Sequence, residues 1–134
     1  MATTTATIIL ASTDLLSDEL ALTTSATLTS AGNSTGITNT SGLSRKTVSG
    51  GHAQYTLFDG SDYTADKAHK LYLKNISTTA AEFFLITVNS EDIGRLYAGD
   101  WAFFPWNNHD GAADIKITPS VSTSITLEYM LFID

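Results

Sequence analysis

The last eleven residues of the chain, SITLEYMLFID, alternate large apolar side chains with other residues over nearly their whole length. Successive side chains of a β-strand point to opposite faces, so residues two apart share a face. A helix repeats every 3.6 residues and does not bring such residues together. The segment therefore predicts a long strand with one face in a hydrophobic core. The core-facing residues are Ile125, Leu127, Tyr129, Leu131 and Ile133.

Shorter segments upstream repeat this alternation. Residues 68–76 place Leu71 and Leu73 on one face, and residues 113–119 alternate two isoleucines with a lysine. Residues 81–89 are apolar on both faces, which is expected of a central strand. Further strands are expected over residues 54–59, 93–97 and 101–106.

Runs of Gly, Asn, Asp, Ser and Pro separate these segments, at intervals of roughly 8 to 12 residues. This spacing favours a sandwich or barrel, and we find no helix longer than the single turn that residues 62–70 allow. Together with two N-terminal strands, the pattern predicts an all-β fold. We expect an antiparallel β-sandwich, jelly-roll-like, of about eight strands, with an extended N-terminal arm.

The N-terminal part has a different composition. All thirteen aromatic residues lie between Tyr55 and Phe132, while Ser and Thr supply 21 of the first 50 residues. Strands are expected at 6–10 and within 19–32, where apolar residues again favour alternate positions, and residues 30–44 favour a turn or mobile loop. We predict an arm at 1–50 and a sandwich domain at 51–134. Such an arm buries little area alone, so we expect it to pack on a neighbouring surface.

Charge and cysteine content exclude several classes of function. The formal net charge is −7, and the seven basic residues are mostly scattered, so we expect no nucleic-acid partner. The chain has no cysteine, which excludes disulfides, thiolate catalysis and Cys-based zinc sites. The N-terminus lacks the pattern of a signal peptide, and no apolar run approaches the roughly 20 residues of a membrane span, so no membrane partner is expected.

Residues able to carry out chemistry are few. The three histidines, His52, His69 and His109, are far apart and form no HxxxH or HxH pair, so we expect no metal site. Asp59 to Asp62 (DGSD) matches half of a calcium loop, but Asp-Gly is also a common turn dipeptide, and we interpret it as a turn. No GxSxG motif or Gly-rich phosphate loop is present. We therefore expect a protein that is not an enzyme, with no catalytic residues and no cofactor.

The segment GDWAFFPW at 99–106 is the strongest candidate for a binding site. In a strand, Trp101, Phe103 and Pro105 share one face, and Trp106 lies on the other. Proline cannot donate to a ladder, so Pro105 indicates an edge position or a strand end. Three interpretations stay open: a core strand, a contact with a partner protein, or a platform for sugars. The candidate partner-binding residues are Trp101, Pro105, Trp106, Ile8, Ile9 and Leu10.

Three segments, at 65–78, 91–106 and 114–132, resemble small β-sandwich structural proteins of tailed-bacteriophage virions. The shared pattern is a strand ending in KNIS, a GD turn before an aromatic-Pro segment, and a final alternating strand with EY. The resemblance implies a capsid decoration or cement protein that clamps neighbouring capsid subunits. It implies as partners the major capsid protein and other copies of this chain, in a homo-oligomer such as a trimer. Such a protein is made in the bacterial host cytoplasm and is located in the virion.

Two other functions fit the same residues. One is a tail, fibre or adaptor component of the virion that contacts a receptor or glycan. The other is a free-standing carbohydrate-binding module with no viral role. A fibre tip needs a trimer and exposed aromatic side chains, and the carbohydrate-binding module needs a free-standing monomer or dimer and a ligand.

Overall fold

A computed structural model describes residues 3–51, 53–120 and 123–134 of the chain. The chain forms two compact units, Met1–Thr38 and Asn39–Asp134. The predicted all-β class is confirmed, since the described residues contain eleven strands, two short 3-10 turns and no α-helix. No helix in these ranges is long and apolar enough to cross a membrane.

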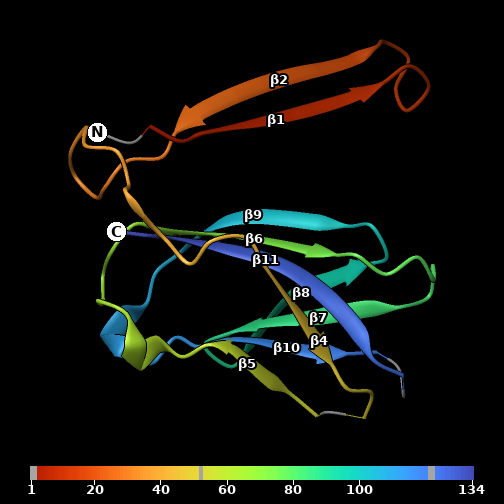
Figure 1. Ribbon diagram of the computed structural model, residues 1–134. Coiled ribbons are helices and arrows are strands. Elements are labelled where there is room, and N and C mark those ends of the chain that lie inside the picture. Colours follow the sequence, from red (N-terminus) through yellow and green to blue (C-terminus); the bar gives the residue numbers. More distant parts are fainter. Residues whose placement is uncertain (1–2, 52, 121–122) are drawn as a thin grey trace. The chain divides into compact units, whose positions relative to one another are not determined.

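The larger unit consists of two antiparallel sheets, consistent with the predicted sandwich. Figure 1 shows them as two layers. In the first sheet, β11 lies between β6 on one side and β3 and β4 on the other, and β9 forms the outer edge beyond β6. The strands of this sheet are β3 (Asn39–Thr40), β4 (Ser44–Val48), β6 (His69–Asn75), β9 (Trp101–Trp106) and β11 (Ile125–Ile133).

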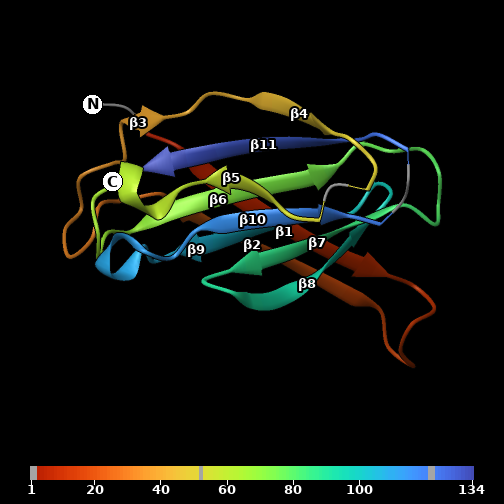
Figure 2. The same cartoon turned by 90° about the horizontal axis from the view of Figure 1, so that it is seen from below.

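The second sheet has the order β5-β10-β7-β8. Figure 2 shows β10 between β5 and β7, with β8 at the far edge. The prediction of a central strand near residues 81–89 is confirmed, because β7 pairs with a strand on each side. The strands are β5 (Tyr55–Phe58), β7 (Phe83–Val88), β8 (Glu91–Tyr97) and β10 (Ile115–Pro119), with the turns η1 (Gly60–Asp62) and η2 (His109–Gly111) outside the sheet.

The core lies between the two sheets and follows the predicted alternation. Leu71 and Leu73 of β6 are fully buried, as is Leu127 of β11, while the residues between them are partly exposed. Each fully buried leucine contributes about 1.5–3 kcal/mol relative to an exposed one. From the other sheet, Ile115 and Ile117 of β10 enter the same cluster. Alternation alone therefore located the core-facing residues of these strands.

The boundary between the units differs from the predicted one. The larger unit begins at Asn39 rather than at residue 51, because β3 and β4 pair with β11. Val48 at the end of β4 is 2% exposed and belongs to the core. The short strands β3 and β4 are mainly polar, so their composition resembles that of the predicted arm. Their place in the sheet comes from backbone pairing with β11, which composition does not reveal.

A buried asparagine links the two sheets. The Asn75 side chain at the end of β6 donates to the backbone carbonyls of Glu82 and Leu96, at 3.1 and 3.0 Å. Its carbonyl oxygen accepts from the Ser77 amide at 3.0 Å. Its backbone also bonds both ways to the turn after β8, through the amide of Gly99 and the carbonyl of Asp100. Asn75 thus joins the ends of β6 and β8 to the turn that leads into β9.

The smaller unit is built on a hairpin of β1 (Thr5–Ser12) and β2 (Leu20–Thr27). The two strands are antiparallel in full register, from the pair Thr5 and Thr27 to the pair Ser12 and Leu20. The two predicted N-terminal strands are confirmed. Residues 13–19 form the connection, and the following chain makes an isolated bridge between Thr29 and Gly36.

Candidate partner-binding surfaces

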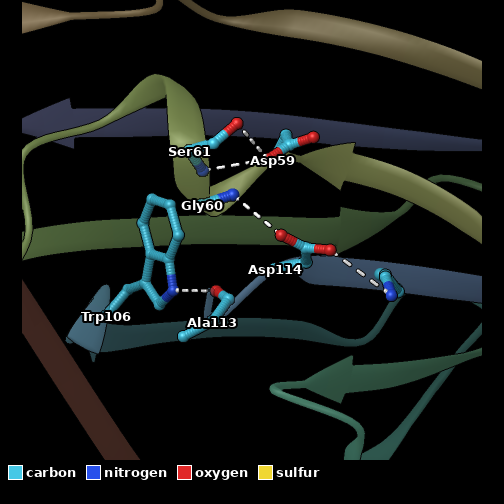
Figure 3. A network of polar contacts seen from close by, with 7 residues as sticks. Asp59, Gly60, Ser61, Trp106, Ala113 and Asp114 are labelled. Carbon is cyan, nitrogen blue, oxygen red and sulfur yellow. Dashed lines mark hydrogen bonds and ion pairs between the residues drawn. The ribbon is translucent and has the colours of Figure 1, made fainter. Parts of the chain in front are cut away.

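The aromatic strand β9 is an edge strand, as Pro105 predicted, and its two tryptophans have opposite roles. Trp106 is 1% exposed and points into the core, whereas Trp101 is 50% exposed on the outer surface. The indole Nε1 of Trp106 donates to the Ala113 carbonyl at 2.8 Å (Figure 3). Its ring packs against three others, with centroids 5.4–6.3 Å apart. These rings belong to Phe58, Tyr63 and His69.

The predicted partner-binding role of Trp106 therefore does not fit its position. The core-strand interpretation holds for one face of the segment, because alternation sends every second side chain inward. Ala102 and Phe104 pack against the core together with Trp106. Trp101 and Pro105 are exposed on the opposite face and stay candidates for contact with a partner.

Trp101 and Pro105 belong to a wider surface on the outside of the five-stranded sheet. Cross-strand pairing places Tyr72 beside both Phe103 and Met130. The rings of Phe103 and Phe132 meet edge to face, with centroids 6.2 Å apart. We call this surface the aromatic face and define it by Tyr72, Trp101, Phe103, Pro105, Met130 and Phe132.

Charged side chains lie among the residues of the aromatic face. Lys70 and Lys74 lie on the same outer side of β6, where Lys74 pairs with Trp101 and Lys70 with Pro105. Arg45 of β4 forms an ion pair with Glu128 of β11 at 3.1 Å, and the two charges offset each other. Lys70 lies near the Asp134 carboxylate, so Lys74 is the charge in excess on this surface; burial lowers the pKa of Lys70, and Asp134 opposes that shift. A predominantly aromatic surface with a positive charge is suited to a partner that is apolar and acidic.

The hairpin carries a second apolar surface. Register places Leu10 opposite Leu22, and Ala6 opposite Ala26, on one side of the hairpin. The two leucines are 48% and 47% exposed. We call this side the hairpin face and define it by Ala6, Ile8, Leu10, Leu20, Leu22 and Ala26. The other side consists mainly of Ser and Thr side chains, and the hydroxyl groups of Thr7 and Ser25 form a hydrogen bond at 2.8 Å.

The predicted N-terminal contact residues are therefore divided between the two sides. Ile8 and Leu10 lie on the hairpin face, while Ile9 lies opposite Thr23 on the hydroxylated side and is 66% exposed. Alternation within β1 places Ile9 on the side opposite Ile8 and Leu10. Strand register then brings Leu22 of β2 beside Leu10.

A small apolar hollow opens between the edge strands β8 and β9. Its volume is about 110 Å³, and its lining includes Ile86, Leu96 and Phe104. Ile93 of β8 lines it and is 60% exposed. Arg95 lies beside the hollow, with its guanidinium 4.5 Å from the centroid of the Phe83 ring. The hollow has room for part of one apolar side chain.

The histidines have separate environments. His69 is fully buried, and its ring nitrogens lie 3.0 Å from the Thr64 carbonyl and 3.1 Å from the Asp134 amide. His109 is exposed and pairs with Asp66 through Nδ1 at 3.0 Å. The hydrogen bond to Asp66 raises the pKa of His109, and the negative charge of Asp110 raises it further. His52 lies outside the described residues.

The DGSD turn and the acidic residues near it are tied to the backbone (Figure 3). The Asp59 carboxylate accepts from both the amide and the hydroxyl of Ser61, at 2.9 and 2.7 Å, and these bonds lower its pKa. The Asp114 carboxylate accepts from the Gly60 amide at 2.8 Å and pairs with Lys116 at 3.3 Å. The turn interpretation is confirmed. Among residues 3–51, 53–120 and 123–134, no group of three acidic or histidine side chains is placed to hold a metal ion.

Comparisons with known proteins add no family to this picture. No protein-family model matches the chain, and no curated protein is detectably similar to it.

Proposed function

We propose that this protein is a non-enzymatic structural protein of a tailed-bacteriophage virion, and in particular a capsid decoration protein. The observation that carries the proposal is the pair of unlike apolar surfaces, the aromatic face on one unit and the hairpin face on the other. Each presents exposed apolar side chains, Trp101 on the aromatic face and Leu10 and Leu22 on the hairpin face, and such area is costly to leave in water. The other aromatic residues of the aromatic face, and Met130, are partly buried. A chain with two such surfaces can clamp neighbouring subunits, which is what a decoration protein does.

The strand order supports the finer part of the proposal, that the larger unit is a jelly roll of eight strand positions. β3 and β4 pair with different parts of β11, so they occupy one position together. Counting that position as the first, one sheet has the order 1-8-3-6 and the other 2-7-4-5. Such interleaved sheets, built from two Greek keys, are typical of jelly rolls, which occur in capsid proteins.

The proposed partners are the major capsid protein and other copies of this chain, and the proposed location is the virion. Quantitative mass spectrometry of purified phage particles that carry this gene tests both. We expect the protein at a copy number comparable to that of the major capsid protein, and cryo-electron microscopy should place it on the head surface. Intact particles that contain no peptide of this protein would refute the proposal.

A tail, fibre or adaptor component is the second candidate, favoured by the half-exposed indole of Trp101. Exposed indoles stack on sugar rings, so a glycan array on the isolated protein separates the two functions. Binding that is lost in Trp101→Ala, with only a few copies per particle, would favour the tail. Binding by a protein found in no particle would favour the free-standing carbohydrate-binding module.

A further inference from the structure

The β1–β2 hairpin is too small to keep its shape by itself. Two-stranded hairpins are marginally stable in water unless a hydrophobic face packs on further structure. One side of the hairpin carries mainly hydroxyl side chains and the exposed Ile9, whereas Leu10 and Leu22 form an apolar cross-strand pair on the hairpin face and are both about half exposed. The surface that covers the hairpin face must therefore be apolar, extended and as long as the strands.

The aromatic face has these properties. We propose that the hairpin face of one copy packs on the aromatic face of a second copy, and that the exchange is reciprocal, which gives a closed dimer. The inference rests on the proposed function in treating both faces as contacts between neighbouring subunits. It assigns them to two copies of this chain, so contact with the capsid falls to the remaining surface of the dimer.

Length is the first argument. β1 and β2 have eight residues each, and the strands β6 and β11 of the aromatic face have seven and nine. At about 3.4 Å per residue, the hairpin spans about 27 Å, so the two surfaces match along the strand direction. Two sheets packed face to face interdigitate side chains of this kind as in an ordinary sandwich.

Charge is the second argument. The first 44 residues contain no lysine or arginine, and the connection between β1 and β2 contains Asp14, Asp18 and Glu19. The aromatic face has an Arg45–Glu128 ion pair, Lys70 near the Asp134 carboxylate, and Lys74 in excess. The acidic hairpin is attracted to this positive charge, whereas two acidic hairpins would repel each other.

Area argues for the reciprocal arrangement. A footprint of about 27 Å by about 10 Å is smaller than the roughly 800 Å² per partner that stable interfaces bury. Two equivalent contacts bury about 540 Å² per partner, or about 1,080 Å² in total, which reaches the roughly 1,000 Å² lower bound for a specific interface. A two-fold axis closes the assembly. One contact per pair would leave each dimer with a free hairpin and a free face, and the chains would polymerise.

Oligomeric state tests the proposal directly. We expect the full chain to sediment at twice its 14.3 kDa mass over a concentration series. The double variant Leu10→Asn with Leu22→Asn should be a monomer, because it replaces a cross-strand pair of the hairpin face. The matched control is Thr7→Asn with Ser25→Asn, a cross-strand pair on the other side, which should remain a dimer. A monomeric wild type, or equal dissociation of both variants, would overturn the proposal.

Cross-linking identifies the surface that the hairpin meets. The chain has no cysteine, so a single Leu22→Cys on the hairpin face or Met130→Cys on the aromatic face is unambiguous. Mixing isotope-labelled Leu22→Cys chains with unlabelled Met130→Cys chains and adding a bismaleimide should yield one labelled chain joined to one unlabelled chain. If a chain that carries both cysteines cross-links only within itself, the hairpin covers its own copy and the proposal fails. Either failure leaves the virion test unaffected, since that test measures the particle.

Discussion

Replacing Trp106 by phenylalanine separates its structural role from a binding role. Trp106 is 1% exposed and its Nε1 donates to the Ala113 carbonyl at 2.8 Å, in a site where Ala113 is itself 4% exposed. Trp101 on the same strand is 50% exposed and serves as the matched control. The same substitution is made at both positions, so any difference between them reflects the site and not the chemistry of the change.

The expected loss has two parts. Phenylalanine cannot donate, so a buried carbonyl is left without this partner, at a cost of about 1–3 kcal/mol. The smaller ring also leaves a void of roughly 40 Å³, which costs about 1 kcal/mol at about 24 cal/mol per Å³. Trp106→Phe should therefore lower the free energy of unfolding by about 2–4 kcal/mol. Trp101→Phe removes no buried bond and should change it by less than about 0.5 kcal/mol.

Urea unfolding followed by far-ultraviolet circular dichroism measures this difference without relying on indole fluorescence, which both substitutions alter. The midpoint should shift while the slope with urea stays constant, since the surface exposed on unfolding is unchanged. Equal effects of the two substitutions, or a loss below about 1 kcal/mol for Trp106→Phe, would refute the assignment of Trp106 to the core.

Three further predictions concern single side chains. Asn75→Ala removes three hydrogen bonds of a fully buried side chain and should cost about 3 kcal/mol in urea unfolding, whereas a loss below about 1 kcal/mol would mean that water replaces the amide. Gly60→Ala places a Cβ 2.6 Å from the Oδ1 atom of the buried Asn108 and should lower the free energy of unfolding by about 1–3 kcal/mol. Gly94→Ala meets no atom within 4 Å and should be near neutral, so equal losses in the two variants would contradict the packing at Gly60. Because the pKa of His109 is raised in the folded protein, its pairing with Asp66 stabilises below the ordinary histidine pKa and is lost as pH rises through the raised value. Asp66→Asn should lower the midpoint of the His109 titration measured by NMR, and an unchanged midpoint would show that this carboxylate is not the cause.

Among the described residues of the larger unit, the strands β5 to β11 were predictable because their signal is local, whereas β3 and β4 were not predicted. Burial on one face imposes a period of two, and the alternation of Leu71 and Leu73 in β6 and of Ile115 and Ile117 in β10 records it. Pro105 likewise indicated an edge strand, because a residue without an amide hydrogen cannot serve a ladder on both sides. The outer position of Tyr72 was also visible in the alternation, but not its neighbours across the sheet.

The candidate surfaces were only partly predictable. Trp101 and Pro105 were expected at a surface, and both are exposed, while Trp106 was placed in the same group and lies in the core. Phe103 was placed on the same face as Trp101 but not among the contact residues, and Met130 and Phe132 of β11, which complete the aromatic face, were not singled out. Their grouping depends on which strands are neighbours, and strands that pair here are separated by tens of residues in sequence.

The all-β class, the position of most strands and the side chains that face the core could be predicted from the sequence, because each follows from backbone geometry within a few residues. The tertiary structure was needed to show that β3 and β4 join the larger unit and that the face of β9 with Trp106, and not the face with Trp101, is buried. It also decided that lysines and aromatic rings from three strands form one surface. The physical reason is that pairing partners are selected by burial and register summed over the whole sheet, and no local segment contains that sum.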